Sequence, residues 1–250
     1  ATYTVHFVVA EKGVYSGDGI AMEVATVAST VVDSDSSWAG QAVPYQQDYL
    51  SPVVIGQVMG DNDPRWSVFW ASDGSAGNPP SAGTLHVGRH VGEDADTARA
   101  GDTLGYIVID SGSGQVGDWL VEAAVGASSI AGMGDSPPYT YALVSEAETA
   151  VVAAAGMNGA NGGWPVLYGA TPFAGTALGL AFDEDQLGDA ERAHAAEEVA
   201  YLALAAVPDE PLDLEPITTT ADVTGAQITF DAAASGGTNL AYNWNFGDGT

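Results

Sequence analysis

Apolar and polar residues alternate along short stretches of the chain, and clusters of Gly, Asp, Asn and Pro separate these stretches. Alternation with a period of two is the pattern of a β-strand that buries one face. It predicts strands at Tyr3–Glu11, Ile20–Ala28, Pro52–Met59, Ser67–Ala71, Thr84–His90 and Leu104–Asp110. Short strands at this spacing, with turns between them, indicate an antiparallel β-sandwich.

The same pattern recurs later in the chain. Phe7–Gly13 matches Tyr106–Gly112 without gaps at an offset of 99, and continuing the match places Glu23 over Glu122. At an offset of 98 a further block repeats, with Val53, Val54, Met59, Trp66 and Val68 over Val151, Val152, Met157, Trp164 and Val166. These matches predict a tandem duplication, with one repeat in residues 1–105 and the next in residues 106–206.

Two segments of the second copy, Glu146–Ala155 and Asp189–Ala206, are rich in Ala, Glu and Leu and look helical by propensity. However, Glu198–Leu204 matches Thr103–Ile109 at an offset of 95, and the earlier copy carries alternating β-branched residues. The repeat therefore predicts strands in the second copy as well, with a short helix inside Glu191–Glu198 left open. The sequence contains no phosphate-binding loop motif, which argues against a nucleotide-binding fold.

A region of different character follows the second copy. Residues 207–220 are rich in Pro and acidic residues, which is typical of an extended linker. Residues 221–250 begin with an alternating stretch and contain Tyr242-Asn-Trp-Asn-Phe-Gly-Asp-Gly249. This motif resembles the signature of the polycystic-kidney-disease-type (PKD) domain, an extracellular immunoglobulin-like sandwich. The resemblance implies a partial domain whose remaining strands come from a continuing chain or from a neighbouring subunit.

The expected fold class is therefore all-β: two tandem antiparallel β-sandwich repeats plus a partial immunoglobulin-like PKD sandwich.

Charge and composition narrow the classes of partner. The chain carries 33 acidic and 5 basic side chains, a formal net charge of −28, which repels nucleic-acid phosphates and anionic lipid headgroups. It has no cysteine, which excludes disulfides and thiolate metal sites. No apolar run approaches the roughly 18–20 residues of a membrane span, so membrane insertion is not expected. The acidity and the scarcity of lysine favour a secreted, extracellular or cell-surface protein.

Three stretches carry a second resemblance: Val8–Tyr15, Gly162–Gly169 and Phe182–Glu198. They resemble the H-type-lectin-like repeats of large bacterial surface and secreted proteins, over residues 3–205. The resemblance implies a six-stranded sandwich in each repeat. For true members of that family it also implies galactose-type sugar binding at a subunit edge in a trimer.

Candidate ligand-binding residues lie beside one loop of each repeat. Trp66 and Trp164 occupy matching positions after loops rich in Gly and Asn, where an aromatic ring can stack on a sugar. The alternative is that both rings simply pack in the core or at its rim. Asp61 and Asp63 precede Trp66 and offer carboxylates to a ligand, with a simple turn as the alternative.

Candidate metal ligands gather near the end of the second repeat, at Asp183, Asp185, Asp189 and Glu191, and Glu93, Asp94 and Asp96 partly mirror them in the first repeat. Carboxylate oxygens on a loop suit calcium, which accepts six to eight oxygen ligands. The spacing does not match an EF-hand, and a solvated acidic loop is the alternative. Arg192 is expected to tie to a carboxylate.

Catalytic signatures are weak. The chain has no cysteine nucleophile and no Gly-x-Ser-x-Gly elbow, and no zinc-type spacing joins its four histidines. The expected function is a non-catalytic binding or structural module of an adhesin or filament, stabilised by calcium. Its partners would be other protein subunits or surface glycans, with a homo-oligomer or filament left open. The alternative is a carbohydrate-binding accessory region of a larger secreted polysaccharide-degrading enzyme.

Overall fold

A computed structural model describes residues 4–17, 20–35 and 37–207, together with the backbone of short strands at 213–214, 218–221, 228–231 and 234–235. The chain divides into one compact unit, Ala1–Ala206, and a second unit, Val207–Thr250. The described residues form strands and loops, with a single 3₁₀ turn, η1 (Met133–Asp135). The expected all-β fold is confirmed.

The described residues of the first unit form fifteen strands. Those of the first repeat are β1 (Gly13–Gly17), β2 (Ile20–Ser29), β3 (Gln41–Val43), β4 (Pro52–Val58), β5 (Val68–Ser72), β6 (Leu85–His90) and β7 (Asp102–Asp110). Those of the second repeat are β8 (Gly112–Val116), β9 (Trp119–Val125), β10 (Tyr139–Ala142), β11 (Thr149–Ala155), β12 (Trp164–Leu167), β13 (Phe173–Ala174), β14 (Ala177–Asp183) and β15 (Val199–Ala206).

Strand order and register occur twice within this unit. The order β1-β2-β7-β4 recurs as β8-β9-β15-β11, and the order β3-β6-β5 recurs as β10-β14-β12, with β13 added beside β14. In the four-stranded pattern, Glu23 of β2 lies opposite Val108 of β7, just as Glu122 of β9 lies opposite Ala203 of β15. Each repeat therefore contributes one four-stranded and one three-stranded array.

The two repeats share a sheet. Strand β5 of the first repeat pairs in parallel with β11 of the second, with Trp70 opposite Ala154 and Ala71 opposite Ala155. This pairing, called the junction below, joins β3-β6-β5 to β11-β15-β9-β8 in one seven-stranded sheet. The boundary expected at residues 105–106 falls inside β7, which pairs with strands of the first repeat only.

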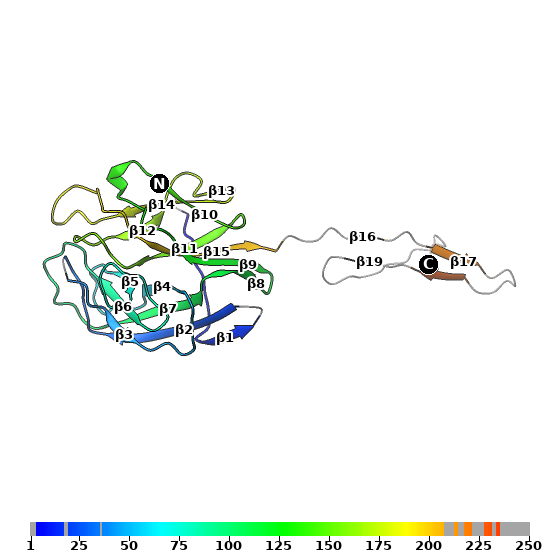
Figure 1. The fold of residues 1–250 in the computed structure, drawn as a ribbon, viewed down its shortest axis with the longest axis horizontal. Coiled ribbons are helices and arrows are strands. Elements are labelled where there is room, and N and C mark those ends of the chain that lie inside the picture. The colour runs from blue at the N-terminus through cyan, green and yellow to red at the C-terminus, as the bar shows by residue number, and fades with distance from the viewer. Residues whose placement is uncertain are drawn as a thin grey trace. The chain divides into compact units, whose positions relative to one another are not determined.

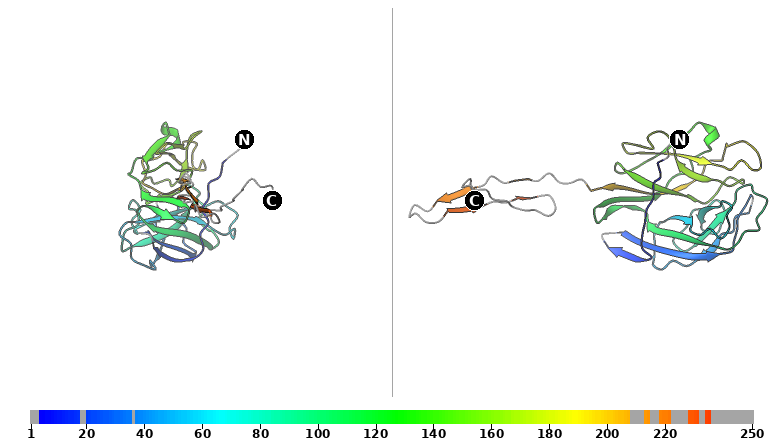
Figure 2. Two further views of the ribbon diagram at one scale, coloured as in Figure 1. Left: turned by 90° about the vertical axis from the view of Figure 1, so that its right-hand side faces the viewer. Right: turned by 180° about the vertical axis from the view of Figure 1, so that it is seen from behind.

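The sheets stack in three layers (Figures 1 and 2). The seven-stranded sheet lies in the middle, because alternate residues of β5 enter different cores. Phe69 and Ala71 belong to the core that includes β2, β4 and β7, whereas Trp70 belongs to the core that includes β10 and β14. Burial on both faces explains the Ala-rich composition of β11 and β15, since small side chains fit between closely packed layers.

Three local expectations need correction or refinement. The strand expected at Tyr3–Glu11 is not formed: Tyr3 lies outside the described residues, and no described strand pairs with residues 4–12. The helix left open inside Glu191–Glu198 is absent, and β15 begins at Val199. The 98-residue match of Val53 to Val151 is two residues out of structural register. Val53 pairs with Ile109 as Thr149 pairs with Leu204, and a two-residue shift keeps each side chain on the same face.

The second unit contains two described strand pairs. Strand β16 (Asp213–Leu214) pairs antiparallel with β19 (Ala234–Ser235), and β17 (Thr218–Ala221) pairs antiparallel with β18 (Ile228–Asp231). Most of the expected linker at residues 207–220, and the PKD-like motif Tyr242–Gly249, lie outside the described residues.

Candidate functional site

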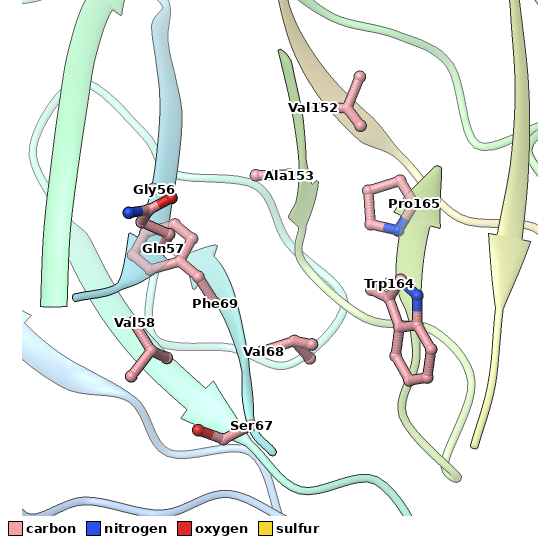
Figure 3. Close-up of a pocket in the computed structure, with 10 residues that line it drawn as sticks. All are labelled: Gly56, Gln57, Val58, Ser67, Val68, Phe69, Val152, Ala153, Trp164 and Pro165. Atoms are coloured by element: carbon pink, nitrogen blue, oxygen red, sulfur yellow. The ribbon is translucent and has the colours of Figure 1, made fainter. Parts of the chain in front are cut away.

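An open groove lies where the two repeats meet. Its volume is about 270 Å³, and strands β4, β5, β11 and β12 each supply part of its wall. Figure 3 shows Trp164 and Pro165 on one side and Gln57, Val58 and Phe69 on the other. The lining residues are Gly56, Gln57, Val58, Ser67, Val68, Phe69, Val152, Ala153, Trp164 and Pro165.

The two candidate tryptophans contact each other beside this groove. The ring centroids of Trp66 and Trp164 lie 5.3 Å apart, and the rings meet edge to face. Trp66 is 36% exposed, whereas Trp164 is half-buried and lines the groove. The sequence placed one aromatic ring in each repeat, and the fold brings both rings to the same place. Edge-to-face packing accounts for one side of each ring and leaves part of Trp66 open to solvent.

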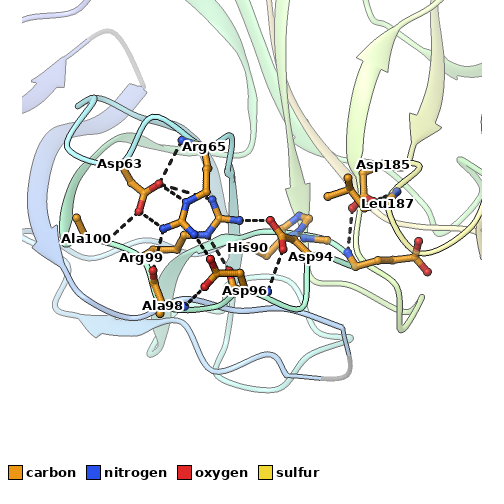
Figure 4. A network of polar contacts seen from close by, with 12 residues as sticks. Asp63, Arg65, His90, Asp94, Asp96, Ala98, Arg99, Ala100, Asp185 and Leu187 are labelled. Carbon is orange, nitrogen blue, oxygen red and sulfur yellow. Dashed lines mark hydrogen bonds and ion pairs between the residues drawn. The ribbon is translucent and has the colours of Figure 1, made fainter.

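Of the two candidate carboxylates, Asp61 is exposed and Asp63 is part of an ion-pair network (Figure 4). Asp63 accepts hydrogen bonds from Nε and Nη2 of Arg65, at 2.7 and 2.6 Å, and from the Ala100 amide at 3.0 Å. The Arg65 guanidinium holds the pKa of Asp63 well below its usual range. Asp63 therefore fixes the loop before Trp66, and its oxygens already have donors.

The candidate metal ligands are engaged separately. Asp183 accepts from Nε of Arg192 at 2.8 Å, which confirms the expected tie of that arginine to a carboxylate. Asp185 accepts from the Leu187 amide, and Asp189 accepts from the Glu191 amide. Among the residues that the structure describes, no three His, Cys, Asp or Glu side chains converge in a way that could hold a metal ion. Calcium binding here stays a prediction.

The acidic loops of the two repeats bind each other. The Glu93 amide donates to Asp185 at 2.9 Å, and the Gly188 amide donates to the Glu93 carboxylate at 3.1 Å. Glu93 was placed by sequence only as a partial counterpart of the second loop. Its observed role is a tie between the loops of the first and second repeats.

A buried imidazole lies between two carboxylates, and the sequence did not predict its burial or these two partners. His194 is hydrogen-bonded through Nε2 to Glu197 at 2.8 Å and through Nδ1 to Glu184, and all three side chains are buried. Burial lowers the pKa of His194, but hydrogen bonds to the two glutamates outweigh it, so the pKa is raised. Glu197 also accepts from the backbone amides of Asn158 and Gly159. The cluster thereby anchors the loop that leads to Trp164.

The duplication also produces a pair of equivalent buried glutamates, one in each repeat. Glu23 and Glu122 occupy equivalent positions, and each accepts a hydrogen bond from a loop amide, from Gln46 at 2.6 Å and Val144 at 2.7 Å. Glu122 also accepts from the Tyr201 hydroxyl at 2.9 Å. The sequence match had aligned the two glutamates, and the structure shows that Glu23 fixes the loop before β4 and Glu122 fixes the loop before β11.

No family model, curated protein or solved structure matches this chain. Within the described part of the chain, no helix is long and apolar enough to cross a membrane.

The groove places polar and apolar groups side by side. Gln57 and Ser67 provide an amide and a hydroxyl, and Trp164 provides an apolar ring beside them. The buried carboxylates and His194 lie in structural hydrogen bonds rather than in the groove lining.

Proposed function

We propose that this chain is a non-catalytic structural and binding module of a secreted or cell-surface protein, in which the two repeats act as one rigid body. The observation that carries the proposal is the shared seven-stranded sheet. A module of this kind suits an adhesin or filament component, because it holds its two ends at a fixed separation without relying on a flexible linker.

Several contacts across the junction support rigidity. Beyond the paired strands, the Gly156 amide donates to the Ala71 carbonyl at 2.7 Å, and the Met157 amide donates to the Ala76 carbonyl at 2.6 Å. Nε2 of His90 is hydrogen-bonded to the Gly163 carbonyl at 2.7 Å in a fully buried setting. Trp70, a first-repeat residue that is 1% exposed, packs in the core of the second repeat. Separating the repeats would expose all of these groups.

Mechanical unfolding of single molecules tests the proposal. A chain held by handles at its two ends should unfold residues 4–206 in one step. The expected gain in contour length is roughly 70 nm, from about 3.5 Å for each extended residue. Two steps of roughly 35 nm each would mean that the repeats are independent domains, and the rigid-module proposal would fail.

Carbohydrate binding is a second candidate, supported by the groove at the junction. Trp164 with its neighbour Trp66, and Gln57 with Ser67, offer a ring to stack on and polar groups to fix orientation, which is the usual composition of a sugar-binding groove. This role would also serve an accessory region of a larger polysaccharide-degrading enzyme.

A glycan array with the full chain tests this candidate. Any glycan bound in the groove should be lost on Trp66→Ala and kept on Trp119→Ala, which removes a similarly exposed tryptophan from β9. Absence of binding to every glycan, or equal loss with both variants, would remove the groove as a sugar site.

A further inference from the structure

Residues 4–12 carry an apolar stripe that nothing in the described chain covers. They lie ahead of β1 and run across the layers as the dark blue trace in Figure 2. Val5, Phe7 and Val9 are 77%, 73% and 86% exposed. The residues between them are half-buried, and Nδ1 of His6 is hydrogen-bonded to Oγ1 of Thr149 at 2.9 Å. One face of the segment therefore lies against its own chain, while the three large apolar side chains face solvent.

The register of the first hairpin identifies the strand to which this segment corresponds. Val14 lies opposite Glu23 in β1-β2, and Ser113 lies opposite Glu122 in β8-β9, so the hairpins are related by an offset of 99. Because β7 runs directly into β8 as residues 4–12 run into β1, the segment is a third copy of the strand represented by β7. β15 is the remaining copy, at an offset of 95 from β7.

In the other two copies, the three positions of the stripe are core positions. Val5, Phe7 and Val9 correspond by these offsets to Leu104, Tyr106 and Val108 of β7 and to Val199, Tyr201 and Ala203 of β15. All six of those side chains are buried, with exposed fractions between 0 and 6%. The residue types agree as well, because each copy has an aliphatic residue, an aromatic residue and a small or aliphatic residue in that order.

The position of this strand within a repeat defines what covers it. β7 lies between β2 and β4, and β15 lies between β9 and β11. In both cases the strand closes the four-stranded array and then leaves the repeat. A strand of this type needs a β2-type neighbour on one side, a β4-type neighbour on the other, and a three-stranded array beneath its apolar face.

We propose that residues 4–12 are the closing strand of a further copy of this repeat, entering between its β2-type and β4-type strands with Val5, Phe7 and Val9 in its core. The partner is a repeat unit that has the equivalents of β1 to β6 and no closing strand of its own. This inference goes beyond the proposed function and does not depend on it. A second copy of the present chain does not fit, because its two closing positions already hold β7 and β15.

An extended chain tests the proposal. An added copy of residues 13–101, placed directly before Tyr3 of the full chain, supplies β1-type to β6-type strands and stops where a closing strand is needed. Hydrogen exchange of the amides of residues 4–12 should slow by at least about 100-fold relative to the 250-residue chain, because they become ladder amides in a closed sheet. Unchanged exchange at residues 4–12, whether the added copy folds or not, would overturn the proposal.

Phe7→Asp separates this role from an ordinary surface effect. In the 250-residue chain this variant should leave the melting temperature within about 2 °C, because the side chain is exposed. In the extended chain it should abolish the protection of residues 4–12 and leave the added copy open to protease. Leu50→Asp, at an 87% exposed leucine of the complete first repeat, is the matched control and should change neither readout.

Two outcomes of these variants would contradict the proposal. Protection that survives Phe7→Asp in the extended chain would mean that the stripe is not the buried face. Dimerisation of the 250-residue chain that Phe7→Asp abolishes would mean that a second copy, rather than a further repeat, covers the stripe.

Discussion

The first and second repeats have the same strand order but different edges. In the first repeat, β4 is the edge of its sheet. The three-stranded array of that repeat ends at β5, which is paired with β11. In the second repeat the pairing is reversed. β11 is paired with β5, and the three-stranded array ends at β12, beside which the described chain places no further strand. At the 98-residue sequence offset, Trp70 and Ala71 match Tyr168 and Gly169, which lie beyond the end of β12 at Leu167, and Gly169 has a φ of +103° that favours glycine.

This difference shows that the second repeat is built onto an edge of the first, because β11 pairs with the edge strand β5. The cores confirm the dependence, because each contains residues of both repeats. Val121, Ala153 and Leu202 of the second repeat belong to the core of the first, and Trp70 of the first belongs to the core of the second. Two copies of one sequence pattern have thus formed a single body with an asymmetric contact.

The largest expected effect comes from Trp70→Ala. The side chain is almost fully buried, and its Nε1 donates to Asp33 at 2.9 Å. Its loss leaves a cavity and removes one donor from the buried Asp33 carboxylate, which keeps the amides of Ala39 and Gly40. We expect a loss of about 3–5 kcal/mol in the free energy of unfolding, measured by urea denaturation. Trp119→Ala, at an exposed tryptophan, should cost less than about 0.5 kcal/mol.

Hydrogen exchange shows which strands Trp70→Ala destabilises, and so whether the two cores depend on each other. Because Trp70 belongs to the first repeat but packs with the second, Trp70→Ala should speed hydrogen exchange in β7 and β15 alike. Faster exchange confined to the first repeat would break the account of interpenetrating cores.

The second prediction concerns acid. Burial lowers the pKa of His90 from 6.5 to about 4, and the buried ring accepts from the Gly92 amide and donates to the Gly163 carbonyl. The unfolded chain therefore binds a proton below pH 6.5 that the folded chain does not. Stability should fall by up to about 3 kcal/mol as the pH drops to 4, at about 1.4 kcal/mol for each pKa unit.

Comparison with His90→Gln isolates this contribution, because an amide can replace the hydrogen bond to Gly163 but does not titrate. Between pH 6.5 and pH 4, the wild type should lose more unfolding free energy than His90→Gln does, and the difference should equal the His90 contribution. His194 should act in the opposite direction: its pKa is raised, so the stability it contributes is complete below pH 6.5 and declines as the pH rises through the folded value. If the unfolding free energy falls equally with pH in wild type and His90→Gln, the lowered pKa of His90 is refuted.

The third prediction uses the equivalent buried glutamates. Glu122→Leu leaves the Val144 amide and the Tyr201 hydroxyl without an acceptor. Glu23→Leu removes the acceptor of the Gln46 amide, while the nearby Tyr49 hydroxyl keeps its hydrogen bond from Gln47. In addition, one carboxylate oxygen of Glu23 has no hydrogen-bond partner in the described chain, so less is lost with it. Glu122→Leu should therefore cost about 1–2 kcal/mol more than Glu23→Leu in urea denaturation. Equal costs would indicate that the Tyr201 contact contributes nothing.

The smallest expected effect is that of calcium. The candidate ligands of the second repeat each accept from a local donor, so we expect calcium binding to be weak and millimolar calcium to raise the melting temperature by less than about 2 °C more than magnesium does. A calcium-specific rise of several degrees that Asp185→Asn abolishes would instead establish the site.

Strand content and duplication could be derived from sequence because both are local patterns. Alternation located β2, β4, β5, β6 and β7 to within about two residues. The repeat correctly made β15 a strand although its Ala-rich sequence looks helical, because a shared register is stronger than propensity. The segment at residues 4–12 has the same alternation, yet it forms no strand, because a strand also needs neighbours that alternation does not supply.

The junction and the groove could not be derived in this way. Pairing of β5 with β11 joins edges 84 residues apart at Trp70 and Ala154, and it depends on how the layers pack. The same packing brings Trp66 against Trp164 and buries Asp33 beside Trp70, although nothing in their local sequence distinguishes them from surface residues. His194 lies beside Glu191 and Arg192 in the sequence, whereas its burial between Glu184 and Glu197 is a tertiary property.

Hydrogen exchange across a urea series measures most directly whether the two repeats form one body. The slowest amides of β7 report on the first repeat, and those of β15 report on the second. A single cooperative unit gives the same free energy of opening and the same dependence on urea for both strands. Protection of β15 that persists at urea concentrations where β7 is already open would contradict the shared-sheet account.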